Sequence, residues 1–246
     1  MKKGLAFFVP LALVFLFCSP VFSQQNEKSI EVVLIDNFDT PDQNEWSWQV
    51  QASRYIDDGS GGGAKYPLIG YFKGVSDSLR TFVKEGDPEP QVLGAKVKYK
   101  RKGDNWFEVY PEKDGKPFEI PFRGNVTTLD FWVWGSNYLY FMDVLVRDAE
   151  GCVHIIPAGN LKFYGWRNII LKVPTYLKQK SSYHSIANNT LTLVGFRFRA
   201  DPSEHADDFT VFIDKVQYTA AGITHVYDGY DLNVADFGDR TTGEGQ

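Results

Sequence analysis

Alternation of apolar and polar residues along the chain is the feature that most limits its possible folds. Successive side chains of a β-strand point to opposite faces, so this period of two is typical of strands that bury one face. The alternating runs are rich in Val, Ile, Thr, Tyr, Phe and Trp, which favour strands. They predict strands over Ile30–Asp36, Trp46–Val50, Leu93–Lys100, Leu129–Trp134, Tyr138–Arg147, Ile169–Val173, Leu191–Arg199 and Phe209–Tyr218.

Turn-forming residues separate these runs, as at Arg101–Asp104, Glu112–Gly115, Ala149–Gly151 and Ala200–Pro202. No helical periodicity persists over the roughly 10 residues that a helix needs. The segment Pro174–Ser185 is the best candidate for a short helical turn or an irregular loop. Eight or more antiparallel strands in one domain predict an all-β fold, an antiparallel β-sandwich of the jelly-roll type.

The first 23 residues are typical of a secretory signal peptide. An apolar run, Leu5–Phe17, follows two lysines, and Val21-Phe22-Ser23 places small residues at the −3 and −1 positions of a cleavage site. The residue before Cys18 is Phe, where a bacterial lipobox has Gly or Ala, so we expect cleavage after Ser23 rather than lipid attachment. No stretch reaches the roughly 20 apolar residues of a membrane span.

We expect residues 24–226 to form a single β-sandwich domain and residues 227–246 to form an acidic, flexible tail. Such a tail is either an unstructured end or a docking peptide that orders on a partner. Without the signal peptide the chain has 24 basic and 31 acidic residues, a net charge of −7, which argues against binding nucleic acid through its phosphates. It also keeps one cysteine, Cys152, so the core alone must stabilise it.

The residues that could support catalysis do not form a recognisable site. Cys152 and His154 would share one face of a strand, but a nucleophile pair needs an orienting group and an oxyanion site, and no neighbouring residue suggests either. The other histidines, His184, His205 and His225, lack metal-ligand spacing. We therefore expect no enzymatic activity.

Aspartates gather at the end of the first predicted strand and around the last one. Terminal strands of jelly rolls often lie side by side, so these carboxylates could hold Ca²⁺, which takes six to eight oxygen ligands. The alternative is that they are ordinary strand-end and turn residues. A structural calcium ion is thus a hypothesis, with no other cofactor expected, and its candidate ligands are Asp36, Asp39, Asp207, Asp208 and Asp214.

Tryptophans on a strand face raise a separate question. Trp132 and Trp134 lie opposite Phe131 and Val133, so this strand is either buried on both sides or covered by a partner on one. Core packing is expected to account for at least half of the six tryptophans. The remainder would serve as a sugar platform or as interface anchors. An acidic partner could meet a basic strand face that consists of Lys96, Lys98, Lys100 and Arg101.

Two blocks of sequence, Val92–Pro111 and Thr128–Pro174, resemble the FlaA family of spirochaete flagellar filament outer layer proteins. The second block carries a paired-tryptophan strand, an LVRD strand end and a Gly-Trp-Arg-Asn strand start. The chain is similar to the shorter FlaA paralogues of spirochaetes with several sheath proteins, such as Leptospira. Further matching segments are Leu34–Phe38, Val194–Pro202, Asp207–Phe209 and Tyr227–Asp231.

This resemblance implies a structural subunit of the filament sheath, which coats the flagellin core of a periplasmic flagellum and biases its curvature for motility. It implies no catalysis. The expected partners are the flagellin core and other sheath proteins, in the periplasm. The residues expected at such interfaces are Trp132, Trp134, Lys96, Lys98, Arg101 and Tyr230.

A second hypothesis is a periplasmic or secreted carbohydrate-binding jelly roll. Carbohydrate-binding modules and galactose-binding domains have a topology similar to the β-sandwich that is predicted here, so the fold alone does not separate the two hypotheses. A coplanar row of exposed aromatic rings beside a groove would favour sugar binding, whereas aromatic rings spread over a flat or convex face would favour assembly.

Overall fold

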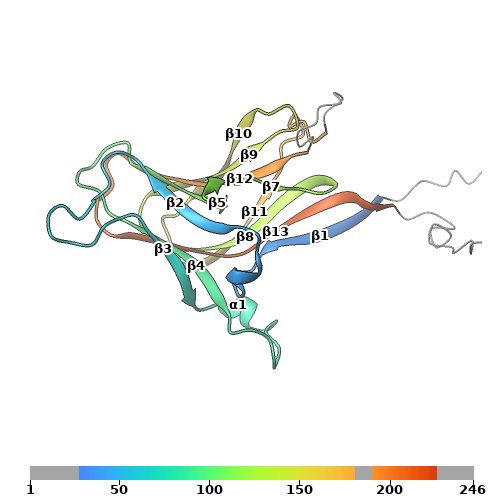
Figure 1. Cartoon of the computed structure of the whole chain (residues 1–246), viewed down its shortest axis with the longest axis horizontal. Coiled ribbons are helices and arrows are strands. Elements are labelled where there is room, and N and C mark those ends of the chain that lie inside the picture. The colour runs from blue at the N-terminus through green and yellow to red at the C-terminus, as the bar shows by residue number, and fades with distance from the viewer. Residues whose placement is uncertain (1–27, 181–189, 226–246) are drawn as a thin grey trace, which may run out of the picture. The chain divides into compact units, whose positions relative to one another are not determined.

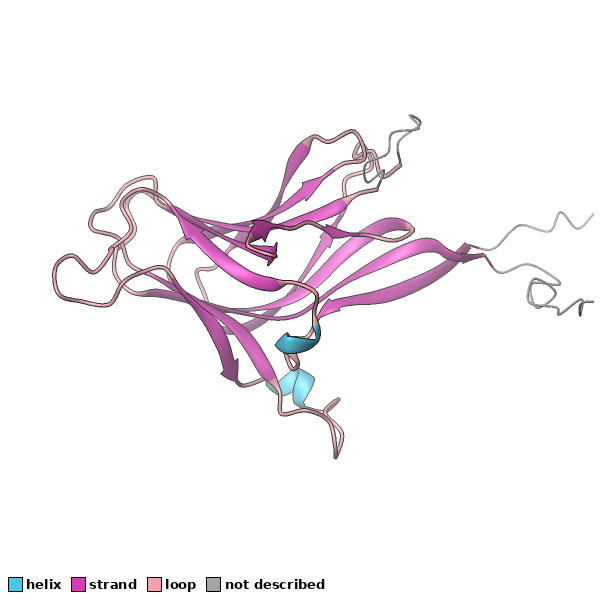
Figure 2. Cartoon of the chain, in the orientation of Figure 1, coloured by secondary structure: helices cyan, strands magenta, loops and turns pink. Residues whose placement is uncertain are grey.

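A computed structural model of the chain describes residues 28–180 and 190–225, and strands form nearly all of their regular structure (Figure 2). The predicted signal peptide, residues 1–23, and the predicted tail, residues 227–246, lie outside the described residues. No helix within the described ranges could span a membrane. The one α-helix there is α1, Asp77–Arg80, which has four residues.

The first of two sheets, sheet A, has the strand order β11-β8-β13-β4-β3, with β1 beside β13. All of its strand pairs are antiparallel. Its strands are β1 (Lys28–Asp36), β3 (Leu68–Lys73), β4 (Gln91–Val97), β8 (Asn125–Ser136), β11 (Tyr164–Lys172) and β13 (Phe209–His225).

Sheet B has the order β10-β9-β12-β5-β2, with β6 beside β5 and β7 beside β12. Its pairs are also antiparallel. Its strands are β2 (Ser47–Ala52), β5 (Trp106–Lys113), β6 (Lys116–Pro117), β7 (Ile120–Pro121), β9 (Tyr140–Arg147), β10 (Val153–Asn160) and β12 (Thr192–Ala200).

The two sheets lie as layers (Figure 1) and share one apolar core. Aromatic rings cross between the layers, with centroids 5.4 Å apart for Phe131 and Phe196 and 3.8 Å apart for Tyr140 and Phe209. Such ring pairs add to the free energy that burial itself provides. The predicted antiparallel β-sandwich is confirmed.

The residues Asp114 and Gly115 explain the tight turn between β5 and β6. Asp114 and Gly115 both have positive φ, at 54° and 72°. A two-residue hairpin turn of this twist needs positive φ at both positions, which Asp and Gly tolerate best. The predicted turn at Glu112–Gly115 is therefore correct.

Other elements differ from the prediction. Strand β3 was not predicted, because Gly70 and the surrounding Gly- and Pro-containing residues hide its alternation. Strands β5 and β10 were not predicted; Pro111 and Pro157 interrupt their apolar patterns. Within the predicted helical turn, the described residues 174–180 contain turns but no helix, and residues 181–185 lie outside the described part.

Gly195 fixes the contact between β12 and β5. Its φ is +154°, it follows a bulge in the pairing with β9, and a Cβ there would lie 2.5 Å from the carbonyl oxygen of Val109. Gly159, at the bulge of the outer strand β10, has a φ of +107° but open space around it. Both glycines have a positive φ that would strain a residue with a side chain, and only Gly195 also lies against a rigid neighbour, the β5 backbone.

We predict that Gly195→Ala destabilises the fold more than Gly159→Ala does. Backbone strain alone costs about 1–3 kcal/mol, and in Gly195→Ala the β5 backbone must also move. Urea unfolding of both variants provides the comparison. Equal losses of free energy would show that the Val109 contact does not constrain the sheet.

Candidate functional site

Aromatic side chains cross the outer face of sheet A in a row. In the strand registers Trp166 of β11 lies opposite Trp134 of β8, Trp134 opposite Phe212 of β13, and Phe212 opposite Gly94 of β4. The ring of Phe72, from β3, lies over Gly94. We call Trp166, Trp134, Phe212 and Phe72 the aromatic row; it joins four strands that are far apart in sequence.

Gly94 makes the row continuous. A Cβ at this position would lie 2.7 Å from ring atoms of both Phe72 and Phe212, closer than real Cβ contacts allow. Without a side chain, the β4 backbone leaves room for the two rings to meet with centroids 5.7 Å apart. The glycine in the otherwise alternating strand is thus explained by ring packing.

Three rings of the row, those of Trp134, Phe212 and Phe72, meet edge to face. The interplanar angle is 69° for Trp134 and Phe212 and 80° for Phe72 and Phe212. This geometry is favourable for aromatic pairs, but it does not create a flat platform. The rings are therefore not arranged as the coplanar stacking surface that a sugar ring would need.

The row borders an apolar hollow of about 210 Å³ between β3, β4 and β13. Phe72 is 51% exposed and Leu68 is 44% exposed, while Trp132, Trp134 and Phe212 are half-buried. Exposed contiguous apolar surface of this kind marks interaction sites in soluble proteins. The outer face of sheet A is therefore the candidate interface.

The structure brings together some of the predicted interface residues. Trp132, Trp134 and Lys96 lie on the outer face of sheet A, and Lys96 Nζ is 3.3 Å from an Asp208 carboxylate oxygen. Tyr230 lies outside the described residues. Phe72, Phe212 and Trp166 were not predicted, because only the lateral register places them beside Trp134.

The prediction of a basic strand face is wrong beyond Lys96, because β4 ends at Val97. Lys98 follows it, half-buried and without a carboxylate within ion-pair distance among the described residues. Lys100 Nζ lies 2.6 Å from Asp58. The Arg101 guanidinium stacks over the Tyr55 ring at 3.4 Å, so part of the expected positive surface is engaged within the chain.

The core holds fewer tryptophans than expected. Of the six, only Trp48 is fully buried, and its indole Nε1 donates to Asp36. Trp46 is half-buried and stacks on Phe118. The other four, Trp106, Trp132, Trp134 and Trp166, are half-buried on strands. The expectation that core packing accounts for at least half of the tryptophans is therefore wrong.

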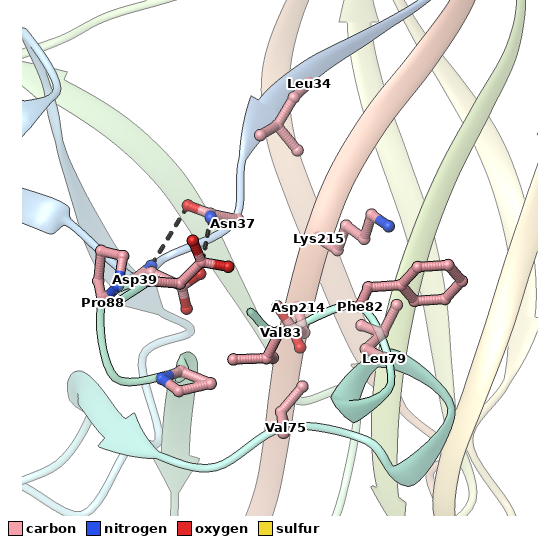
Figure 3. A pocket seen from close by; sticks show the side chains of 12 residues that line it. Leu34, Asn37, Asp39, Val75, Leu79, Phe82, Val83, Pro88, Asp214 and Lys215 are labelled. Carbon is pink, nitrogen blue, oxygen red and sulfur yellow. Dashed lines mark hydrogen bonds between the residues drawn. The ribbon is translucent and has the colours of Figure 1, made fainter. Parts of the chain in front are cut away.

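Three of the five predicted calcium ligands lie near one another. Asp36, Asp39 and Asp214 meet where β1 ends beside a bulge in β13, and Asp39 and Asp214 line a cavity of about 190 Å³ with Leu79 and Phe82 (Figure 3). Asp36 accepts from Phe38, Asn44 and Trp48, and Asp39 accepts from Gln91. Both are therefore largely used in fixing the chain.

Burial raises the pKa of the Asp214 carboxyl to about 7, and the negative charges of Asp39 and Asp36 add to this effect. The side chain is 4% exposed, and its stabilising contacts are the backbone N–H and the charge of Lys215. Burial likewise raises the pKa of Asp36 and Asp39. Three acids with raised pKa values indicate a site that favours protons or a cation.

The remaining two candidate ligands lie elsewhere. Asp208 accepts from the Tyr66 hydroxyl and pairs with Lys96, while Asp207 is exposed. Within the part of the chain that the structure describes, no three His, Cys, Asp or Glu side chains are arranged as metal ligands. The five aspartates thus do not form one ligand set, and calcium binding stays a prediction for the three near Asp214.

The histidine that was considered for catalysis does have an orienting carboxylate. His154 Nε2 lies 2.7 Å from the buried Asp148, which also accepts from the Cys152 backbone N–H. The Cys152 thiol is exposed, and no hydrogen bond from it to His154 is present among the described residues. The contact between His154 and Asp148 therefore joins β10 to the preceding turn. The absence of enzymatic activity stays a prediction.

Comparisons with known proteins agree on one family. The sequence model of the family described as "Flagellar filament outer layer protein Flaa" matches residues 73–233. The "Putative flagellar filament outer layer-like protein" of Brachyspira hyodysenteriae is 24% identical over 189 residues, covering 77% of this chain and 78% of that protein. Neither finding tests the predicted genus.

Solved structures similar to this chain include carbohydrate-binding modules. One from the β-sandwich superfamily has a TM-score of 0.45 at 11% identity, covering 73% of this chain and 59% of that one. The family 11 module of a Clostridium thermocellum cellulosomal cellulase has a TM-score of 0.40 at 10% identity, covering 81% and 99%.

We predict that Asp214 makes the fold less stable as pH rises from about 4 to 7. Its carboxyl keeps its proton in the folded state throughout this window and loses it in the unfolded state, so rising pH favours unfolding. Asp214→Asn should flatten this slope and raise the free energy of unfolding at pH 8. Chemical unfolding across pH measures both, with Asp207→Asn as the exposed control. An unchanged slope in Asp214→Asn would contradict the prediction.

The hypothesis of calcium binding is tested by comparing the wild type with Asp214→Asn. If the ion binds between Asp39 and Asp214, millimolar Ca²⁺ should raise the melting temperature of the wild type at pH 8 but not that of Asp214→Asn. Indifference of the wild type to both Ca²⁺ and a chelator would remove the calcium hypothesis.

Proposed function

Since the chain belongs to the FlaA family of flagellar filament outer layer proteins, we propose that it is a structural subunit of the sheath of a periplasmic flagellum. In this role it coats the flagellin core, contacts other sheath proteins, and biases the curvature of the filament. The predicted signal peptide would deliver it to the periplasm.

The observation that carries the proposal is the aromatic row on the outer face of sheet A. Trp and Phe side chains that are fixed by their neighbours lose little conformational freedom on binding, which makes them effective interface anchors. A protein that works as a monomer gains nothing from leaving Phe72 and Leu68 in water. A subunit that is packed among others covers them.

The ring geometry also separates this proposal from carbohydrate binding. Stacking on sugar requires exposed ring faces in one plane, whereas Trp134 and Phe72 both meet Phe212 edge to face. We therefore favour assembly over sugar recognition.

Deletion of the gene tests the role in the cell. We expect purified periplasmic filaments from the deletion strain to be thinner or less curved by electron microscopy, with reduced motility. Filaments of unchanged diameter and curvature, in cells of unchanged motility, would contradict the proposal.

A variant pair tests the surface itself. We predict that Trp134→Ala weakens co-sedimentation of the purified chain with filaments from the deletion strain by roughly 30-fold, the loss of about 2 kcal/mol expected at an interface anchor. Trp106→Ala is the matched control, since Trp106 is also half-buried on a strand but lies on sheet B. Similar losses for both variants, or none for Trp134→Ala, would show that the aromatic row is not the interface.

A further inference from the structure

Strand β11 is an edge strand with an unpaired side. It pairs with β8 over all nine residues, Tyr164–Lys172, without a register shift. No other described strand pairs with it, so one row of its backbone N–H and C=O groups has no strand partner within the described ranges. Such an edge is a template for another extended segment.

The other edges are interrupted or shorter. Strand β10 contains Pro157 and a register shift after it, and the pairing of β1 shifts near both of its ends. Strands β2 and β3 have six residues each. Interruptions and short lengths are common ways in which proteins protect an edge. Strand β11 has none of these protections, and it exposes Tyr164 (77%) and Ile170 (63%).

The segment around β11 is strongly basic. Residues 161–180 contain five Lys or Arg and no Asp or Glu, in a chain whose net charge is −5. Lys178 pairs with Glu150, and the Arg167 guanidinium stacks on Phe163. Among the described residues, no carboxylate forms an ion pair with Lys162, Arg167 or Lys172. Two β11 edges would therefore repel each other, so the edge favours an acidic partner.

The C-terminal sequence of this chain has the complementary properties. Residues 227–246 contain five Asp or Glu and one Arg. Within them, the sequence 228–236 alternates, so that in an extended strand Tyr230, Leu232 and Val234 would share one face with the aspartates at its two ends. Its nine residues match the length of β11, and its apolar face would lie beside Tyr164 and Ile170.

We propose that β11 accepts residues 228–236 of a second copy of this chain as an added strand. Main-chain hydrogen bonds would provide affinity, and attraction between the acidic segment and the basic edge would select the partner. This inference deepens the proposed function, since it rests on the chain being a subunit among copies. It assigns one lateral contact between those copies.

Charge reversal in residues 24–246 tests the contact. We expect Arg167→Glu with Lys172→Glu to weaken self-association at least tenfold in sedimentation velocity, and Asp228→Lys with Asp236→Lys to do the same. An equimolar mixture of the two double variants should recover association, because one copy then offers a reversed edge and the other a reversed tail. Salt should weaken association of the wild type.

The matched control is Lys116→Glu, a charge reversal on β6 of sheet B, which should leave association unchanged. Thermal unfolding of every variant confirms that the fold is kept. A monomeric wild type at all concentrations overturns the proposal, as does a mixture that associates no better than its components. Hydrogen exchange identifies the remaining case. If the wild type is monomeric, and β11 is less protected from exchange in Asp228→Lys with Asp236→Lys than in the wild type, the occupant is the tail of the same copy. The second-copy assignment is then wrong.

Failure of this contact is distinguishable from failure of the sheath function. The association experiment uses purified protein alone, whereas the gene deletion reports on the filament. A filament that changes on deletion, together with a chain that does not self-associate, would leave the function standing and remove the β11 contact.

Discussion

The pairing of β13 is the constraint on which the rest of the structure depends. This strand has 17 residues, and backbone groups along it need partners on both sides. Strand β8 pairs with one side, while β4 and then β1 share the other. The change of partner coincides with the bulge between Asp214 and Gln217, where Lys215 has a φ of 47°. Phe212 in the aromatic row, the buried Asp214 and the start of the β1 pairing thus all follow from one strand.

Period-two alternation predicted the strands that bury one face against the core, such as β8 with Phe131 and Val133 inside. It missed β3 and β10, whose apolar side chains are partly in water and whose patterns contain Gly or Pro. It also missed β5, whose pattern Pro111 interrupts although Phe107 and Val109 are buried. The alternation also found Trp132 and Trp134, because both lie on one strand. It could not find Phe72, Phe212 or Trp166, since the lateral register of a sheet depends on long-range pairing that no local pattern records.

The two outer faces of the sandwich differ in chemistry. On sheet B, the buried carboxylates of Glu108 and Asp143 pair with Arg197 and Arg199, which satisfies the charges within the sheet. On the outer face of sheet A, the aromatic row lies beside the Lys96–Asp208 pair. A face whose charges are already paired offers little to a partner, whereas a face of fixed rings offers apolar area at low entropic cost. This difference gives the sandwich two unlike outer faces, as the proposed role in a filament coat would require.

The proposed contacts also differ in their physical basis. The aromatic row lies on a face and is apolar, while the β11 edge lies at the margin of the same sheet and is basic. At 0.1 M, salt largely screens interactions between exposed charges that are more than about 10 Å apart, and it leaves apolar burial largely intact. Contacts between copies through the edge would therefore weaken with ionic strength before contacts through the aromatic row do. In the proposed sheath, lateral contacts would therefore loosen while the subunits stay attached, because charge would select the edge contact and apolar burial would hold the contact at the aromatic row.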